Sequence, residues 1–168
     1  MDSPKCKRYF QPHVLVSRGW HISEIVASSV WLNNPDVWGE HFAIDGIYST
    51  TNGNLFRSSR QDHPWLQWHF GETTTVKAVR IRNRVDCCGN ELRNIEIRVV
   101  EDQGNKQITC GNIQSPGKEN QQYDVRCQNP QPQGNFIVIQ RNQLNVVLQI
   151  NELILNPPAP GKKQLKVS

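Results

Sequence analysis

The sequence predicts an all-β protein, an antiparallel β-sandwich with long ligand-binding loops at one end. Sustained apolar spacing of the helical kind is hard to find along the chain, whereas apolar and polar residues alternate in several short runs. Gly, Pro, Asn and Asp interrupt the chain about every ten residues, as in proteins built of short strands and turns. Two sheets would bury the alternating apolar faces between them.

Five segments carry the strand pattern. The clearest is RNIEIRVVED, in which Ile95, Ile97 and Val99 fall on one face and Glu96 and Arg98 on the other. The predicted strands, in chain order, are residues 66–70, 75–83, 93–102, 135–142 and 145–155.

The chain has 168 residues, enough for one domain with its own core. We expect residues 1–19 to close the sandwich, residues 20–155 to form the folded domain, and the Pro-rich, basic residues 156–168 to form a flexible tail. The segment from Trp20 to Arg60 is rich in aromatic residues in a loop-like setting. These either pack the loops onto the scaffold or form the wall of a binding site.

Composition excludes several classes of function. With 36% hydrophobic and 20% charged residues the chain is globular, and its formal charge of +4 is too dispersed for a nucleic-acid binder. No apolar run is long enough to span a bilayer, and no signal peptide follows Met1, so secretion would require a signal already removed. His21, His41 and His63 have no nucleophile, carboxylate pair or phosphate loop beside them, so we do not expect an enzyme.

The five cysteines suggest three different situations. Cys87 and Cys88 are adjacent, with Cα atoms about 3.8 Å apart, below the usual disulfide spacing. They are therefore a small strained ring with a flat sulfur surface, two buried free thiols, or partners of other cysteines. A Cys110–Cys127 disulfide would close a turn-rich excursion and stabilise the fold by about 3 kcal/mol. Cys6 then has no partner in this scheme, which suggests a free thiol or an intermolecular disulfide in a homo-oligomer. No spacing fits zinc.

Three stretches together resemble a known family. AIDG (43–46), HPWLQWHF (63–70) and VKAVRIRNRVDCCGNEL (76–92) resemble the F-type lectins, or fucolectins, a branch of the discoidin-like, galactose-binding-like jelly rolls. TCGNI, VRCQNP and NEL fall at matching places further on. The resemblance covers roughly residues 28–155. It implies a secreted protein that binds fucose-like or related sugars of glycans and glycoproteins, with a Cys87–Cys88 disulfide packed against the sugar.

The resemblance also implies a sugar site, which this chain has altered. The family uses a His, an Arg two residues before an Asp, and a second Arg. Arg84 and Asp86 match, Arg57 occupies the His position and Glu91 the position of the second Arg. Arginine presents fixed donors to sugar oxygens, whereas Glu91 only accepts. A mismatch of this kind costs about 1–3 kcal/mol. We therefore expect glycan binding with shifted specificity; the alternative is a surface ion-pair cluster of little energetic consequence.

A structural Ca²⁺ under the sugar site is the third implication. Its carboxylate ligands match Asp45 and Glu152. Further oxygen ligands are expected from the 42–54 loop and from the residue before Glu152, with Phe42, Ile47, Asn54 and Asn151 as candidates. Without a metal, Asp45 would simply cap a turn beside Gly46.

Two positions depart from the family together. Many members have a disulfide at the positions that hold Leu55 and Asn151 here, as expected if the bond was lost as a unit. The competing functional hypothesis is a discoidin-like adhesion module that binds protein or lipid through apolar loop tips. The candidate tips are Trp31, Leu32, Trp38 and Leu55.

Overall fold

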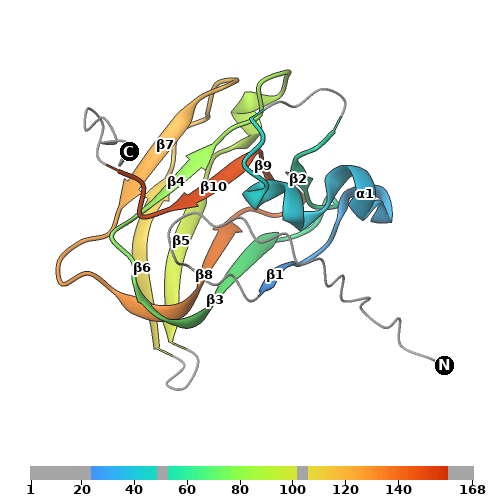
Figure 1. Ribbon diagram of the computed structural model, residues 1–168. Coiled ribbons are helices and arrows are strands. Elements are labelled where there is room, and N and C mark those ends of the chain that lie inside the picture. The colour runs from blue at the N-terminus through green and yellow to red at the C-terminus, as the bar shows by residue number, and fades with distance from the viewer. Residues whose placement is uncertain (1–23, 49–52, 102–105, 159–168) are drawn as a thin grey trace, which may run out of the picture.

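The chain folds into two antiparallel sheets that face each other, with a short two-stranded ribbon at one edge (Figure 1). The computed structural model describes residues 24–48, 53–101 and 106–158. The predicted N-terminal segment 1–19, Cys6 and most of the predicted tail lie outside these residues. The all-β sandwich predicted from the sequence is confirmed.

The larger sheet has five strands, in the order β1 (Glu24–Ala27), β3 (Trp65–Thr75), β8 (Gln133–Arg141), β5 (Ile95–Glu101) and β6 (Lys106–Ile113). The smaller sheet has three, in the order β10 (Glu152–Leu155), β4 (Ala78–Arg82) and β7 (Gln122–Arg126). The ribbon consists of β2 (Phe56–Arg57) and β9 (Gln149–Ile150).

The core lies between the two sheets and follows the alternation of the strands. In β3, Leu66, Trp68 and Phe70 are buried, and in β5 the same holds for Ile97 and Val99. Most of their neighbours in sequence are less buried because successive side chains of a strand alternate between its faces, and Val100 at the end of β5 is a buried exception. The predicted strand at 145–155 divides into β9 and β10. The sequence did not reveal β6 and β7, whose residues are largely polar.

The two open sides of the sandwich are closed in different ways. On one side, the short helices η1 (Trp31–Asn33), α1 (Pro35–Trp38) and η2 (Glu40–Ile44) lie beside the ribbon, and η2 contacts β1 and β10, the edge strands of the two sheets (Figure 1). On the other side, the predicted Cys110–Cys127 disulfide is confirmed and joins β6 to the residue after β7. The disulfide therefore ties the two sheets together.

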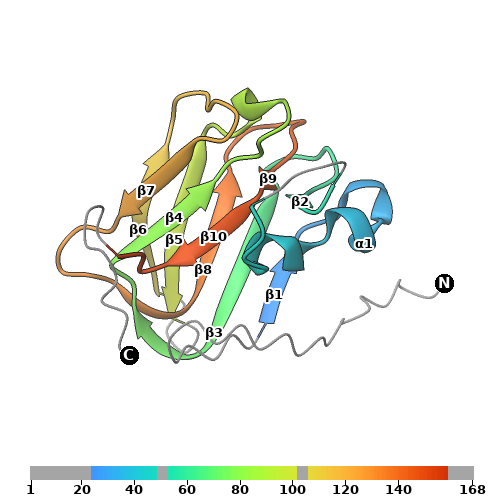
Figure 2. The same cartoon turned by 45° about the horizontal axis from the view of Figure 1, so that its top comes forward.

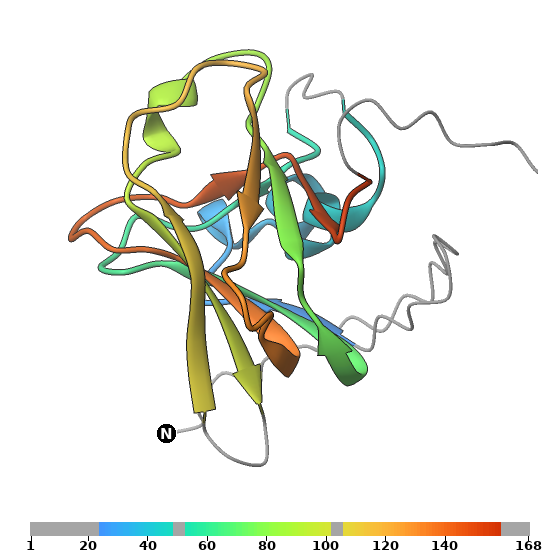
Figure 3. The ribbon, with the colours of Figure 1, turned by 90° about the vertical axis from the view of Figure 1, so that its left-hand side faces the viewer.

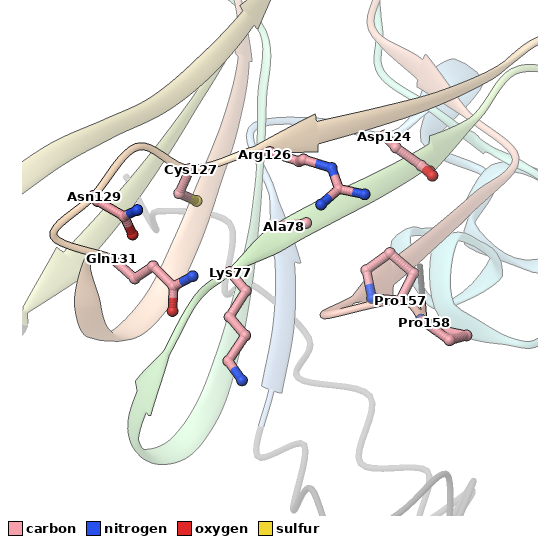
Figure 4. A pocket seen from close by; sticks show the side chains of 9 residues that line it. All are labelled: Lys77, Ala78, Asp124, Arg126, Cys127, Asn129, Gln131, Pro157 and Pro158. Atoms are coloured by element: carbon pink, nitrogen blue, oxygen red, sulfur yellow. The ribbon is translucent and has the colours of Figure 1, made fainter. Parts of the chain in front are cut away.

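The helix η3 (Gly89–Glu91) lies at the end of the sandwich that is uppermost in Figures 2 and 3. It follows β4 through the segment that contains the two adjacent cysteines. The opposite end of β4 borders a groove of about 350 Å³, lined by Lys77, Arg126, Pro157 and other residues (Figure 4). The predicted site residues of the loop after β4 are thus separated from this groove by the length of the strand.

Candidate functional site

Arg84 is the centre of a buried hydrogen-bond network just beyond the end of β4. Its Nε and Nη2 donate to the two carboxylate oxygens of Asp86 at 2.7 and 2.8 Å, and its Nη1 donates to Gln149 Oε1 at 2.9 Å. Arg84 is only 4% exposed. The hydrogen bonds from Arg84 lower the pKa of Asp86 to about 2. The predicted pairing of Arg84 and Asp86 in one site is thus present in the structure.

Gln149 connects this pair to the loop that carries the cysteines. Its Oε1 accepts from Arg84, and its Nε2 donates to the carbonyl oxygen of Cys88 at 2.9 Å. Gln149 is 1% exposed, so both ends of its amide are fixed inside the protein. Sequence reasoning missed this residue. The one available signal was its position three residues before Glu152.

Arg57 lies next to the network, on the neighbouring strand of the ribbon. It is the cross-strand partner of Gln149, and directly opposed residues of an antiparallel pair project to the same face. Its guanidinium carbon lies 4.3 Å from the ring centroid of Trp31 and 6.0 Å from that of Trp38. Arg57 therefore lies beside this network as a cation held against an aromatic wall. We call Arg57, Arg84, Asp86, Gln149 and the loop 87–90 the arginine site.

Arg57 has no anionic partner among the residues that the structure describes. Its Nε is buried and makes no hydrogen bond. The aromatic residues of the 20–60 segment were predicted either to pack loops or to form the wall of a site. Trp31 lies against Arg57, one of the predicted site residues.

Glu91 belongs to the same loop but faces other charges. Arg141 is 3% exposed, and burial lowers its pKa, with Arg93 lowering it further and Glu91 opposing the shift. One carboxylate oxygen of Glu91 is itself buried without a hydrogen bond. Within the described ranges, no hydrogen bond or ion pair joins Glu91 to Arg57 or Arg84. The structure therefore groups Glu91 with Arg141 rather than with the other predicted sugar contacts.

Cys87 and Cys88 are free, exposed thiols. The disulfide between them, which the family resemblance implied, is absent from the structure, and that prediction is corrected here. The physical reason is the one noted from the sequence: neighbouring Cα atoms lie about 3.8 Å apart, closer than a relaxed disulfide requires. A hydrogen bond to Cys88 raises the pKa of the Cys87 thiol to about 11.

Hydrogen bonds of Asn83 and Gly89 anchor the loop that carries Cys87 and Cys88. The side-chain amide of Asn83 donates to Gly89 O at 2.7 Å and to Lys118 O at 3.0 Å, and Gly89 N donates to Glu119 Oε1 at 3.1 Å. A Cβ at position 89 would lie 2.4 Å from the backbone nitrogen of Glu119. Glycine is therefore required there, and the loop presents its cysteines from a fixed base.

Asp45 and Glu152 form a pair of carboxyl groups near the ribbon. Glu152 is 4% exposed, and burial together with the neighbouring Asp45 raises its pKa to about 8. Burial also raises the pKa of Asp45. Glu152 Oε2 accepts from Gly46 N at 3.0 Å, and Asp45 Oδ1 accepts from Ile47 N at 2.8 Å. Asp45 therefore caps a turn and also contacts the predicted second carboxylate ligand.

The other predicted metal ligands are placed as follows. Asn151 is 1% exposed, and neither polar atom of its side chain has a hydrogen-bond partner. Phe42 lies in η2 just before Asp45, and Ile47 contributes its N–H to the Asp45 turn. Asn54 donates its N–H to Val37 O, and residues 49–52 before it lie outside the described ranges. The partly buried Asp45 carboxyl and the buried Glu152 carboxyl are hard oxygen ligands of the kind that Ca²⁺ takes, although the described residues hold no group of three His, Cys, Asp or Glu side chains that could bind a metal.

Leu55 and Asn151, the positions of the missing family disulfide, remain neighbours in this fold. The ribbon pairs Phe56 with Ile150, and Leu55 and Asn151 extend this antiparallel pair by one step. Leu55 is fully buried. Its prediction as an exposed loop tip is therefore wrong, because an apolar side chain beside the ribbon is taken into the core.

The remaining predicted tips divide into two groups. Trp31 and Trp38 are half-buried around Arg57, whereas Leu32 is 74% exposed. The sequence did not single out Leu144, which is 66% exposed. None of the helices in the described part of the chain has the length and apolar character needed to cross a membrane.

Two packed antiparallel sheets with the arginine site in the loops at one end define a discoidin-like β-sandwich of the carbohydrate-binding, F-lectin-like kind. The sequence profile of the NedA-like, galactose-binding domain matches residues 42–134, more than half of the chain. The chain therefore belongs to this family, which is in keeping with the resemblance found in the sequence.

Individual relatives point the same way. Fucolectin-1 of Anguilla japonica is 27% identical over 125 residues, 71% of this chain and 68% of the relative. Fucolectin of Anguilla anguilla is 36% identical over 59 residues, 34% of this chain and 37% of the relative. The match thus spans well under half of the A. anguilla protein.

Solved structures share the fold. An F-lectin from the serum of striped bass, Morone saxatilis, superposes with a TM-score of 0.69 at 22% identity, covering 79% of this chain and 45% of that one. The lectin domain of lectinolysin complexed with Lewis B antigen gives 0.68 at 18% identity, covering 84% and 95%.

Proposed function

We propose that this protein is a lectin that binds a terminal sugar of fucose-like or related type in the arginine site. The observation that carries the proposal is the fixed geometry of Arg84. Asp86 and Gln149 occupy three of its N–H donors, which leaves the remaining donors of the guanidinium oriented for a ligand oxygen. A buried, pre-oriented donor loses little freedom on binding. The similarity to two fucolectins supports the assignment.

The surroundings of Arg84 suit a molecule with one polar and one apolar face. Cys87 and Cys88 are exposed beside Asp86, on a loop that Asn83 and Gly89 hold in place. Sulfur is a soft, weakly polar atom that packs well against C–H groups. Arg57 and Trp31 stand on the other side of Gln149. The sugar would therefore meet hydrogen-bond donors and an apolar sulfur surface together.

Calcium is part of the proposal as a structural ion. Asp45 and Glu152 would hold it, with oxygen atoms of Phe42, Ile47, Asn54 and Asn151 as further candidates. When bound, the ion would supply positive charge that offsets the neighbouring carboxyl groups of Asp45 and Glu152. Its role would be to fix the ribbon and η2, from which Gln149 and Arg57 reach the arginine site. We also propose an extracellular location, supported by the serum origin of one structural relative.

A glycan array probed with the folded protein tests the proposal. We expect binding to fucosylated or related glycans that is weakened at least about tenfold by Arg84→Lys, because a lysine cannot reproduce the planar fork. The matched control is Arg80→Lys, which alters the other two-bond arginine–aspartate pair, Arg80–Asp124, away from the arginine site. If the folded protein binds no glycan, the lectin proposal is wrong.

A second candidate function is adhesion to protein or lipid through apolar loop tips. It rests on Leu32 and Leu144, which are 74% and 66% exposed. Binding of this kind would be insensitive to Arg84→Lys but lost in the double variant Leu32→Ser, Leu144→Ser. Pull-down on vesicles of phosphatidylserine and phosphatidylcholine, with both variants, separates the two functions.

A further inference from the structure

The charges of the arginine site do not balance. Arg84 is neutralised by Asp86 through two hydrogen bonds, and Glu91 opposes the charge of Arg141. Arg57 has no carboxylate within ion-pair distance in the described part of the chain. The arrangement thus has one arginine more than its acidic residues compensate.

Arg57 is also held in a position from which it can act on a ligand. Its guanidinium carbon lies over the Trp31 ring, 4.3 Å from the ring centroid, and its Nε is buried without an acceptor. A partly buried cation without a counter-charge is costly, and an aromatic face compensates only part of that cost. An anion supplied by a ligand would complete the compensation.

The position of Arg57 places such an anion next to the proposed sugar. Arg57 is the cross-strand partner of Gln149, which accepts a hydrogen bond from Arg84. One ligand can therefore engage Arg84 with a hydroxyl or ring oxygen and Arg57 with a charged substituent. Planar bidentate recognition of carboxylate and sulfate oxygens is the contact to which arginine is best suited.

We infer that the arginine site selects acidic glycans, in which the terminal sugar carries a carboxylate or a sulfate ester, and that Arg57 binds this anionic group. The inference rests on the proposed lectin function and specifies its ligand class. Glu91 does not oppose it, because among the described residues no hydrogen bond or ion pair joins Glu91 to Arg57, and the charge of Glu91 acts on Arg141.

The competing explanation for any binding of acidic glycans is general attraction to basic surface. Lys77 and Arg126 provide such a surface at the groove of Figure 4, at the opposite end of β4. Both residues are exposed. Arg126→Gln is therefore a matched control, since it removes the same charge as Arg57→Gln from a different end of the molecule.

The test measures dissociation constants for lactose and fucosyllactose as neutral glycans, and for 3′-sulfolactose and 3′-sialyllactose as acidic ones. We expect at least about tenfold tighter binding of one or both acidic glycans, the change typical of one charge-assisted contact. The preference should disappear in Arg57→Gln, persist in part in Arg57→Lys, and remain in Arg126→Gln. It should also weaken when salt is raised from 50 to 300 mM.

The outcomes separate the two proposals. Binding of neutral glycans with no gain from sulfate or carboxylate would overturn the acidic-glycan inference and leave the lectin proposal standing. Loss of the acidic preference in Arg126→Gln but not in Arg57→Gln would also overturn it. No binding of any of the four glycans by the folded protein would remove the basis of both. The sulfate and sialyl arms identify which anion is preferred.

Discussion

Arg84 and Asp86 meet through two parallel hydrogen bonds of 2.7 and 2.8 Å, although Asp86 is 34% exposed and Arg84 is almost fully buried. The pair therefore combines a desolvated cation with a counter-charge that solvent can still reach. Its geometry sets both the proposed ligand contact and a measurable pH dependence of stability.

Asp86→Asn is expected to lower the free energy of unfolding at pH 7 by about 1–2 kcal/mol, less than for a fully buried pair because water screens Asp86. Arg84 lowers the pKa of Asp86 from 3.8 to about 2. A lowered pKa in the folded state gives stability that is present above 3.8 and is lost as the pH falls toward 2. Urea unfolding of wild type and variant at pH 7, 4 and 2.5 should show their difference shrinking. A difference independent of pH would contradict this account.

Calcium should stabilise the fold through Asp45 and Glu152. At a concentration 100-fold above its Kd, a ligand of the folded state adds about 2.7 kcal/mol. This corresponds to a rise in Tm of roughly 5–10 °C for a chain of this size. Thermal unfolding in Ca²⁺ and in chelator measures the effect.

Glu152→Gln should abolish the calcium effect, whereas the exposed Glu72→Gln should retain it. A calcium-dependent Tm that survives Glu152→Gln would place the ion elsewhere.

A disulfide engineered between positions 55 and 151 should form and stabilise the protein. Leu55 directly precedes β2 and Asn151 directly follows β9, so the two positions lie one step beyond the paired Phe56 and Ile150. The bond would close a loop of nearly 100 residues, for which chain entropy predicts up to about 4.7 kcal/mol, and engineered bonds usually deliver less. It would also remove an amide that is buried without partners. The Tm of the double variant with and without reductant gives the effect, and the two single variants are the controls.

The native disulfide Cys110–Cys127 is expected to contribute to stability but not to glycan affinity. Replacing Cys110 and Cys127 together by Ser should lower the free energy of unfolding by about 2–4 kcal/mol, because the bond joins the edges of the two sheets. Glycan affinity should stay unchanged, since Cys127 borders the groove at the opposite end of β4 from Arg84. Urea unfolding and a glycan titration on the same sample check both statements. A matching loss of affinity would show that the two ends are coupled.

Local pattern was sufficient to predict the sheets but not all of their strands. The alternation in 66–70 and 93–102 anticipated the buried faces of β3 and β5, because each strand buries every second residue. β6 and β7 were not predicted because their stability comes from strand pairing and from the disulfide rather than from apolar alternation. Leu55 was misjudged for a related reason: its burial depends on a ribbon formed with residues nearly 100 positions away.

The site was predictable only where a motif marks it. Arg84, Asp86, Asp45 and Glu152 lie together in pairs as expected. The contacts of Gln149 with Arg84, of Arg57 with Trp31, and the placement of Glu91 near Arg141 all arise from the packing of distant loops. No spacing within one segment encodes such contacts.

Gln149 and Glu152 are three residues apart on the stretch that runs from β9 into β10, one in the arginine site and the other in the carboxylate pair. If this short segment serves both proposed ligands, their binding equilibria become interdependent. Whatever factor Ca²⁺ contributes to glycan affinity, the glycan must contribute the same factor to Ca²⁺ affinity. In surroundings poor in calcium, an encounter with the right glycan would therefore help the protein to retain its ion.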